Sequence, residues 1–237
     1  MMANTLFVSD LHLSEETDHI EQGFYRFLDN EGEISRLFLL GDIFEAWVGD
    51  DEDSDLARRF ADALIVRAQR GTRIFFTPGN RDFLLGADYL SQFGGRRLED
   101  EVCVDVAGSQ ALLMHGDTLC TDDTDYLKFR ALVHSPQWQA EMLSKPLEER
   151  RALARQLRAM SMDAASNKAE DIMDVNDLAV EDALQRHCVT RLIHGHTHRP
   201  RRHRLAHAER IVLGDWTSTG WCLRDDGATL ALEQFPL

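Results

Sequence analysis

The sequence predicts an α/β protein, built as a layered α/β-β/α sandwich of two mixed sheets with outer helices and a helical insertion. Three observations lead to this fold class. Apolar runs of strand length alternate with helical segments in the first half of the chain, the last part returns to short strands, and the stretch between them contains helices alone. With 237 residues, of which 43% are hydrophobic, the chain is long enough to bury one large core.

The first half of the chain is expected to alternate strands with helices. Strands are predicted at 5–8, 37–40, 74–77, 102–106 and 110–114, and helices at 17–28, 55–70 and 82–93. The second of these helices has Leu56, Phe60 and Leu64 at helical spacing, and Gly71 ends it. After the insertion, further strands are predicted at 191–193, 210–213, 220–223 and 229–233.

Residues 124–180 interrupt this alternation and are predicted to be a helical insertion between two parts of the core, residues 1–123 and 181–237. Helices are expected at 125–133, 137–143, 147–160 and from 168–173 towards 177–187. Residues 128–168 hold eight Lys and Arg against four Asp and Glu, in a chain whose net charge is −15. Two interpretations remain open: a helical hairpin with a solvated basic face, or a lid that offers an apolar groove with cations at its rim to an anionic amphiphile.

Composition excludes several classes of protein. The strong negative charge argues against general nucleic-acid binding, which requires a basic surface. No apolar run is long enough to span a membrane, and the N-terminal residues do not resemble a signal segment. The four cysteines form no CxxC pair, which favours reduced thiols in a cytoplasmic protein.

Five short polar blocks are the candidate site, because each follows an apolar run that is predicted to be a strand. They contain seven potential metal ligands: Asp10 and His12, Asp42, Asn80, His115, and His196 and His198. Loops that leave the same end of a sheet converge, so ligands far apart in the sequence can meet. Carboxylate, imidazole and amide donors suit Mn²⁺, Fe²⁺, Zn²⁺ or Mg²⁺. Seven ligands exceed the needs of one ion with an open position, so we predict two metals that share a carboxylate.

These blocks, in this order, resemble the calcineurin-like metallophosphoesterase superfamily. Longer strings resemble, within it, the pyrophosphohydrolases that act on UDP-2,3-diacylglucosamine in lipid A biosynthesis: GDIFEAWVGDD at 41–51, GNRDFLLG at 79–86, HGDTLCTDD at 115–123, IMDVN at 172–176 and HGHTHRP at 194–200. The similarity extends over essentially the whole chain, including the insertion.

The resemblance implies a dinuclear centre with two Mn²⁺ ions per chain. One ion would be held by Asp10, His12, Asp42 and His198, and the other by Asp42, Asn80, His115 and His196, with Asp42 as the bridge. Two such ions would acidify a water for attack on the UMP-side phosphorus, giving UMP and 2,3-diacylglucosamine 1-phosphate. The catalytic residues implied are Asp42, Asn80, Arg81 and His115. A cytoplasmic enzyme at the inner membrane is expected, and no protein partner is inferred.

Arg81 departs from the broader superfamily, in which the asparagine is often followed by a histidine that can protonate the leaving group. An arginine stays charged and clamps phosphate with its fork of donors. A phosphate leaving group needs charge stabilisation more than a proton, so we predict an electrostatic clamp. The alternative is an ion pair with Asp82 or another neighbour.

Further substrate contacts are implied by the same resemblance. They are Asn80, Arg81 and His196 at the centre, and Asp123, Tyr126, Arg158, Ser161 and Lys168 in or beside the insertion. An asparagine contact of the family aligns here with Ala165, and Asn167 is the nearest substitute. For each residue of the insertion, helix capping or a solvated charge is the competing interpretation.

Further residues beside the blocks also have expected roles. Phe44, Trp47, Phe83 and Leu84 are expected either to line an acyl groove or to pack in the core. Asp117 is expected to orient an imidazole, and Asp50 and Asp51 to lie in a solvated loop or behind the ligands. The cluster Arg199, Arg201, Arg202 and Arg204 faces solvent by default, or else phosphate or an anionic membrane surface.

Two rival functions remain open at this point. A nucleotide pyrophosphatase or phosphodiesterase with the same metal centre would act on soluble substrates and need no apolar insertion. A non-catalytic scaffold of the same fold would be expected to lack some ligands, whereas all seven are present.

Overall fold

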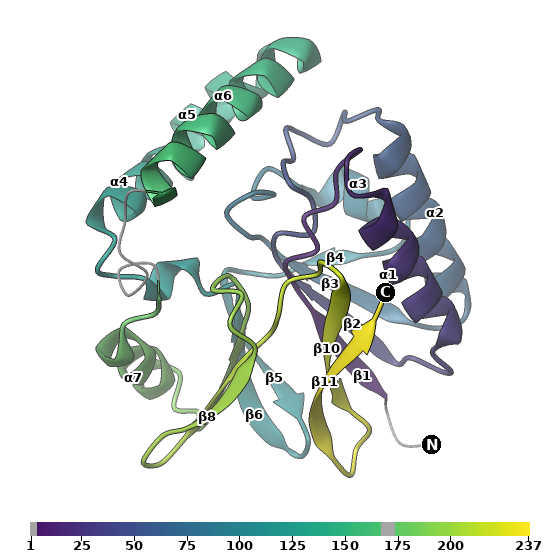
Figure 1. The fold of residues 1–237 in the computed structure, drawn as a ribbon, viewed down its shortest axis with the longest axis vertical. Coiled ribbons are helices and arrows are strands. Elements are labelled where there is room, and N and C mark those ends of the chain that lie inside the picture. Colours follow the sequence, from purple (N-terminus) through teal and green to yellow (C-terminus); the bar gives the residue numbers. More distant parts are fainter. Residues whose placement is uncertain (1–3, 167–173) are drawn as a thin grey trace.

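The computed structural model describes residues 4–166 and 174–237, and within these ranges all side chains except those of 162–166. Two β-sheets face each other, and helices cover their outer faces (Figure 1). The predicted fold class, a layered sandwich of two mixed sheets, is confirmed. Among the described residues, no helix has both the length and the apolar character needed to cross a membrane.

The first sheet contains six strands in the order β11-β10-β1-β2-β3-β4. Its parallel part comprises β1 (Thr5–Val8), β2 (Arg36–Leu40), β3 (Arg73–Thr77) and β4 (Arg96–Arg97), and its antiparallel edge comprises β10 (Thr219–Asp225) and β11 (Leu230–Pro236). The strands β1 and β2, in the middle of this sheet, are buried on both faces, which explains why residues 5–8 and 37–40 are almost entirely apolar in the sequence.

The second sheet contains five strands in the order β5-β6-β7-β9-β8. They are β5 (Glu101–Val106), β6 (Ser109–Met114), β7 (Arg191–His194), β8 (Arg201–Arg204) and β9 (Glu209–Val212). The strands β6, β7 and β9 run parallel to one another, and β5 and β8 are antiparallel edge strands.

Three apolar layers hold the sandwich together. The first lies between the first sheet and the helices α1 (Asp18–Asn30), α2 (Asp55–Gln69) and α3 (Ala87–Ser91), and it includes Leu6 and Leu39. The second fills the space between the sheets with side chains such as Phe7 and Phe38. The third lies between the second sheet and α7 (Asp177–Arg186). Neighbouring strand residues therefore belong to different layers, as the twofold alternation of a strand requires.

The sequence predictions differ from the structure in two respects. The helix expected at 82–93 is wrong in its first turn: α3 begins at Ala87, because the buried Asp82 accepts backbone hydrogen bonds inside a loop. The strands β4 and β8 were not predicted, because both are basic edge segments without an apolar face. The helix expected from 168–173 lies outside the described residues.

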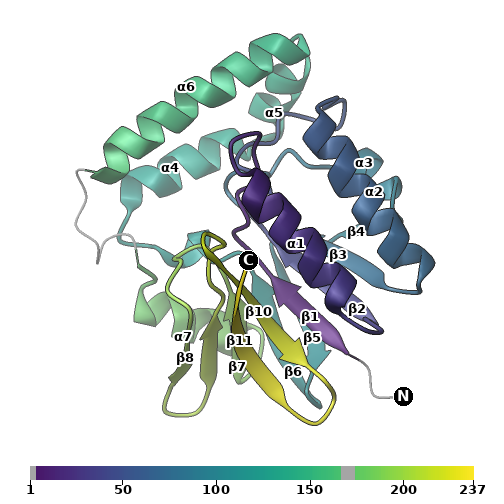
Figure 2. The same ribbon diagram turned by 45° about the vertical axis from the view of Figure 1, so that its right-hand side comes forward.

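The insertion forms three helices, α4 (Thr124–Val133), α5 (Pro136–Leu143) and α6 (Leu147–Ser166). Side chains cap the first two helices: Asp123 accepts from the Tyr126 backbone N–H at the start of α4, and Ser135 accepts from the Trp138 backbone N–H at the start of α5, where Pro136 is the first helical residue. The three helices lie together beyond one end of the sheets, whereas α7 packs on the second sheet (Figures 1 and 2). The expected core boundary at 180 therefore falls inside α7.

Candidate metal centre

All five predicted blocks lie at the carboxyl ends of strands, on the side of the sheets that faces the insertion. The loops after β1, β2 and β3 come from the first sheet, and those after β6 and β7 come from the second. Backbone hydrogen bonds join neighbouring loops: Asp10 N donates to Gly41 O at 3.1 Å, and Gly195 N donates to His115 O at 2.8 Å. The site is therefore assembled where the two sheets meet.

Left-handed backbone geometry marks most of the expected ligands. In residues 4–166 and 174–237, seven residues other than glycine have a positive φ, and five of them are expected ligands: Asp10, His12, Asp42, His196 and His198, with φ between 48° and 67°. This conformation costs an L-residue roughly 1–2 kcal/mol. Its concentration here indicates that the fold imposes the conformation in order to aim these side chains at one point.

Two glycines allow the loops to approach one another. A Cβ atom on Gly79 would lie 2.2 Å from Asp42 Oδ1, and one on Gly195 would lie 2.2 Å from Asp10 Oδ2. Both distances are far below van der Waals contact. The glycines in the Gly-Asn and Gly-His blocks are therefore required for close packing of the carboxylates.

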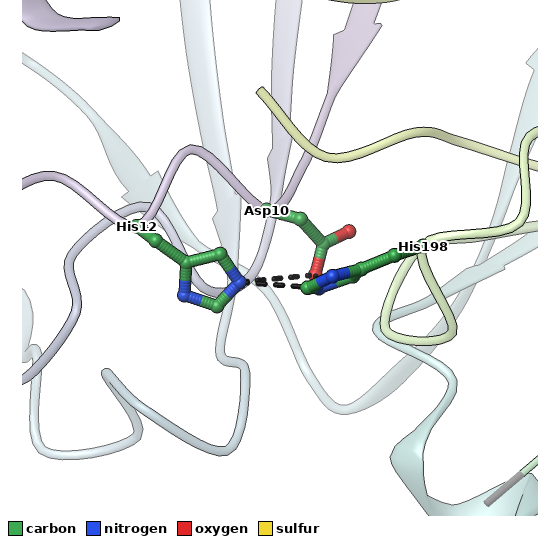
Figure 3. Close-up of side chains that lie close together, drawn as sticks. All are labelled: Asp10, His12 and His198. Carbon is green, nitrogen blue, oxygen red and sulfur yellow. Dashed lines mark hydrogen bonds and ion pairs between the residues drawn. The ribbon is translucent and has the colours of Figure 1, made fainter. Parts of the chain in front are cut away.

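One group of expected ligands comprises Asp10, His12 and His198 (Figure 3). The two imidazoles point towards each other, with 3.2 Å between their Nε2 atoms. Asp10 Oδ1 lies 3.4 Å from His198 Nε2 and 4.0 Å from His12 Nε2. The Asp10 side chain is completely buried and also accepts the Ser9 hydroxyl at 2.5 Å.

The other group comprises Asn80, His115 and His196. The Asn80 Oδ1 atom lies 2.9 Å from both His115 Nε2 and His196 Nδ1. Asp42 stands between the two groups, since its Oδ1 lies 3.6 Å from His115 Nε2 and its Oδ2 lies 4.0 Å from His12 Nε2. All seven expected ligands are thus brought together, with Asp42 between the two groups.

The donor set fits divalent cations. Two buried carboxylates, an amide oxygen and four imidazoles converge, and these are the donors that divalent metal ions bind in proteins. The electrostatics agree with this. Although burial opposes it, the negative charges of Asp42 and Asp10 raise the pKa of His115 to about 9. Burial likewise opposes the shift at Asp10, but the His198 hydrogen bond and nearby imidazoles hold its pKa well below the usual range.

A cavity of about 360 Å³ opens onto these residues. Its lining includes His12, Asp42, Asn80, His196 and His198 from the centre, Arg81 and Glu45 from loops of the core, Arg158 from α6, and Asp215. The Arg81 backbone N–H donates to Asp42 Oδ1 at 2.8 Å, and its side-chain Nε lies 4.0 Å from Asp42 Oδ2. Within the part of the chain that the structure describes, this buried Nε has no hydrogen-bond partner.

The comparisons with known proteins agree with this geometry. The model of the calcineurin-like phosphoesterase family matches residues 3–200. The chain belongs to this family. It is 47% identical over 239 residues to a UDP-2,3-diacylglucosamine hydrolase from Cellvibrio japonicus (strain Ueda107), covering 99% of this chain and 100% of the relative. It is 46% identical over 237 residues to the protein of that name from Klebsiella pneumoniae subsp. pneumoniae, covering 98% and 99%.

Solved structures with the same fold are more distant. A structure described as a novel archaeal phosphodiesterase has a TM-score of 0.51 at 13% identity and covers 99% of both chains. Vacuolar protein sorting 29 from Cryptosporidium parvum has a TM-score of 0.50 at 12% identity, covering 99% of this chain and 98% of that one. At these identities the likeness establishes the phosphoesterase fold alone.

Two acidic residues that support the centre of this phosphoesterase were missed from the sequence. Asp82 is buried and accepts the backbone N–H groups of Gly79 at 2.8 Å and Ile43 at 2.7 Å, and it thereby ties the Asn80 loop to the Asp42 loop. Burial and the charge of Asp42 raise the pKa of Asp82 to about 6. Asp82 does not form the ion pair with Arg81 that was considered from the sequence. The available sequence signal for the role of Asp82 was its position directly after the Gly-Asn-Arg block, which contains an expected ligand.

Glu45 was the other omission. Its carboxylate contacts His12 Nδ1 at 3.1 Å through one oxygen and the Arg158 guanidinium through the other. Burial opposes the shift, but the contact with His12 and the charge of Arg158 keep the pKa of Glu45 below its ordinary value. The residue lies in the string that follows Asp42, where nothing in the sequence separates it from a solvated loop residue.

Asp117 has a different role from the one expected. Its Oδ2 accepts the Tyr126 hydroxyl at 2.5 Å and Arg130 Nε at 2.6 Å, whereas His115 Nδ1 lies 2.9 Å from the backbone carbonyl of Leu40. The carbonyl therefore orients the imidazole. Asp117 instead fixes the first helix of the insertion to the loop that carries His115. Burial and the Asp117 charge raise the pKa of Tyr126 far above its ordinary value.

The other expected contacts are only partly at the cavity. Arg158 lines it, and the Tyr126 ring lies 6.2 Å from the His196 ring, centroid to centroid. Asp123 caps α4, and Ser161 is exposed on α6. Lys168 and Asn167 lie outside the described residues, and the side chain of Ala165 is not among those described.

The apolar candidates divide between the core and the insertion. Phe44, Trp47 and Leu84 are buried in the first core layer. Phe83 stacks on His134 of the insertion at 4.7 Å between ring centroids. Core packing is therefore the correct interpretation for the first three residues.

Ion pairs account for much of the insertion's positive charge. Arg130 contacts Asp117 and Asp100, Arg150 contacts Asp51, Arg151 contacts Glu52 and Asp53, and Arg158 contacts Glu45. The basic insertion thus docks on acidic loops of the core. Asp50 accepts backbone N–H groups at the start of α3. In the basic cluster, Arg199 contacts Asp174 and Arg202 contacts Glu209.

Proposed function

We propose that this phosphoesterase hydrolyses the pyrophosphate bond of UDP-2,3-diacylglucosamine, releasing UMP and 2,3-diacylglucosamine 1-phosphate. The observation that carries the proposal is the cavity in which the convergent ligands, Arg81 and Arg158 meet. It places two guanidinium groups beside the expected metals, as an anionic diphosphate requires. The names of relatives that match nearly the whole chain support this choice of substrate.

The cofactor that we propose is a pair of Mn²⁺ ions. Asp10, His12, Asp42 and His198 would hold one, and Asp42, Asn80, His115 and His196 would hold the other. When bound, the two ions supply an acidified water for in-line attack and neutralise the phosphoryl oxygens. The convergence of the seven side chains supports two positions, and the choice of Mn²⁺ rests on the family resemblance.

Arg81 is proposed to clamp the diphosphate. Its backbone N–H holds Asp42 in place, and its buried Nε, which has no partner in the described part of the chain, is available to a phosphate oxygen. A guanidinium neutralises the charge that develops as the anhydride bond breaks. His196 and Asn80, which line the same cavity, would orient the same phosphate.

The insertion, residues 124–180, is proposed to be the lid that binds the lipid part of the substrate, over a core of residues 1–123 and 181–237. Its helices expose the large apolar side chains Phe129, Leu132, Leu143 and Met160. Such a surface suits acyl chains and the cytoplasmic face of the inner membrane, where we place the enzyme. Asp123, Tyr126, Ser161 and Lys168 remain proposed contacts to the head group, together with Arg158.

An activity assay tests the reaction. The protein, freed of metal and then supplied with Mn²⁺, should release UMP from UDP-2,3-diacylglucosamine, and the metal-free protein should not. Equal hydrolysis rates on a soluble nucleoside diphosphate sugar without acyl chains would favour a general nucleotide pyrophosphatase. Absence of hydrolysis on either substrate would favour a non-catalytic scaffold.

A pair of variants tests the lipid-binding role. Leu143, 45% exposed on α5 of the insertion, and Val66, 43% exposed on α2 of the core, are both apolar surface residues of similar exposure. Leu143→Ser should raise KM for the diacylated substrate and leave a small phosphodiester unaffected, whereas Val66→Ser should change neither. Equal effects of the two variants would contradict an acyl-binding insertion.

A further inference from the structure

Glu45 occupies a position between the metal centre and the insertion. It lies in the loop after β2, where its backbone N–H donates to Leu13 O at 3.0 Å. One carboxylate oxygen lies 3.1 Å from Nδ1 of His12, an ion-pair contact that is not aligned as a hydrogen bond, and the other contacts Nε of Arg158 on α6. All three side chains are half-buried and line the same cavity.

The Glu45 carboxylate is therefore shared between the His12 imidazole and the Arg158 guanidinium. His12 presents Nε2 to Asp10 and His198, so its Nδ1 faces away from the expected metal and towards Glu45. A carboxylate behind a ligating imidazole fixes the ring and raises its basicity, and its loss typically costs 10–100-fold in metal affinity. A guanidinium on the same carboxylate draws negative charge away from the imidazole.

We propose that Glu45 is a positioning residue that couples the grip of Arg158 on the anionic substrate to the affinity of the metal centre at His12. When a phosphate group of the substrate takes Arg158, Glu45 is left to His12 alone, and the imidazole becomes the stronger ligand. Coupling of this kind is reciprocal, so metal at His12 also favours release of Arg158 to the substrate. This inference deepens the proposed function and rests on its metal centre.

The structure provides a matched control in the same group of ligands. His198 also has a carboxylate behind its Nδ1, from Asp215 at 3.7 Å. Among the residues that the structure describes, Asp215 contacts His198 but no side chain of the insertion, so it supports an imidazole without connecting it to Arg158. Changing Asp215 should weaken the metal centre but leave the effect of Arg158 intact.

The test is a double-mutant cycle that measures Mn²⁺ affinity by calorimetry on metal-free protein, with the fold checked by circular dichroism. Glu45→Gln keeps the shape of the side chain and should weaken Mn²⁺ binding by about tenfold or more. Arg158→Met should tighten Mn²⁺ binding by about threefold while Glu45 is present, and by less than about twofold in the Glu45→Gln background. Arg158→Met should also raise KM for the lipid substrate.

The control cycle combines Asp215→Asn with Arg158→Met. The effects of these two substitutions on the free energy of Mn²⁺ binding should add. Direct repulsion between Arg158 and the metal would act equally in all backgrounds, so equal effects of Arg158→Met with Glu45 and with Glu45→Gln would overturn the coupling. Non-additivity in both cycles would overturn it too, because it would indicate a general distortion. A wild-type protein that binds no Mn²⁺ would instead refute the metal centre itself, and with it the coupling.

Discussion

The close packing of Gly195 against Asp10 allows a sharp test of the centre. In Gly195→Ala, the new Cβ would lie 2.2 Å from Asp10 Oδ2 and 2.4 Å from Ser9 Oγ. Real Cβ contacts are essentially never shorter than 3.0 Å, so the His196 loop and the Asp10 carboxylate must separate by at least 0.8 Å. Gly195 does not have a positive φ, so alanine adds no backbone strain and its effect comes from the displacement.

That displacement acts on two expected ligands at once, because the His196 backbone N–H donates to Asp10 Oδ2 at 3.0 Å. A misplacement of about 1 Å costs on the order of 10²-fold in rate, or about 2.7 kcal/mol of transition-state stabilisation. We therefore expect Gly195→Ala to lower kcat/KM for Mn²⁺-dependent UMP release by about a hundredfold and to weaken Mn²⁺ binding in calorimetry.

Gly32 provides the control, because a Cβ there would meet nothing within 4 Å and its φ is not positive. Gly32→Ala should leave activity and Mn²⁺ affinity unchanged and stabilise the fold slightly by restricting the unfolded chain. If Gly195→Ala kept an activity within twofold of the wild type, the loops would be more compliant than their packing indicates, and the geometric account of the centre would be refuted.

Three further predictions concern the bridge, the clamp and a surface ion pair. Asp42→Ala removes a ligand from both expected metal positions, so metal analysis by mass spectrometry should show a greater loss of bound metal than for Asn80→Ala. A wild-type protein loaded with Mn²⁺ that never exceeds one ion per chain would contradict the two-metal proposal. Arg81→Lys keeps the charge but loses the fork, and Arg81→Ala loses both, so hydrolysis rates should fall in that order, by about 10²–10³ for alanine. Recovery of wild-type rates by Arg81→His, with a new limb in the pH profile, would indicate leaving-group protonation instead. Glu101→Gln should lower the free energy of unfolding by about 0.5–1 kcal/mol at pH 7. Hydrogen bonding to Arg186 lowers the pKa of Glu101 in the folded protein. The stabilisation is therefore present above pH 4.5 and is lost as the pH falls through the lowered pKa. If wild type and Glu101→Gln differed by the same free energy of unfolding at acidic and at neutral pH, this account would be wrong.

The strands and the seven expected ligands could be predicted because burial and chemistry leave a direct pattern in the sequence. The strand that contains Leu37 and Leu39 is buried on both faces from residue 37 to residue 40 and is apolar over that run, and Asp42 lies two residues beyond its end. Glu45 and Asp82 could not be found in this way. Their roles depend on which loops and helices meet in space, and an acidic residue that supports an imidazole is identical in sequence to one in solvent.

The insertion shows the same limit for charge. Its excess of Lys and Arg predicts a solvated face or a rim for an anionic ligand. In the structure, four of these arginines contact carboxylates of the core: Arg130, Arg150, Arg151 and Arg158. The number of charged residues predicts the sign of a surface, but it does not show which groups those residues contact. The edge strands β4 and β8 escaped prediction for a related reason, since neither has an apolar face to reveal it.

The ion pairs between the insertion and the core have a consequence for ionic strength. Arg150 pairs with Asp51, which is 61% exposed, but the guanidinium itself is only 3% exposed and also donates to the neutral Val48 carbonyl, so dissolved salt leaves that second bond in place. Arg158, further along α6, is 32% exposed at the edge of the cavity, where the screening length falls from about 10 Å at 0.1 M salt to about 3 Å at 1 M. Concentrated salt should therefore loosen α6 at its distal half first, and the beginning of the helix should stay in place. The sandwich, which is held together by apolar side chains, would be left intact.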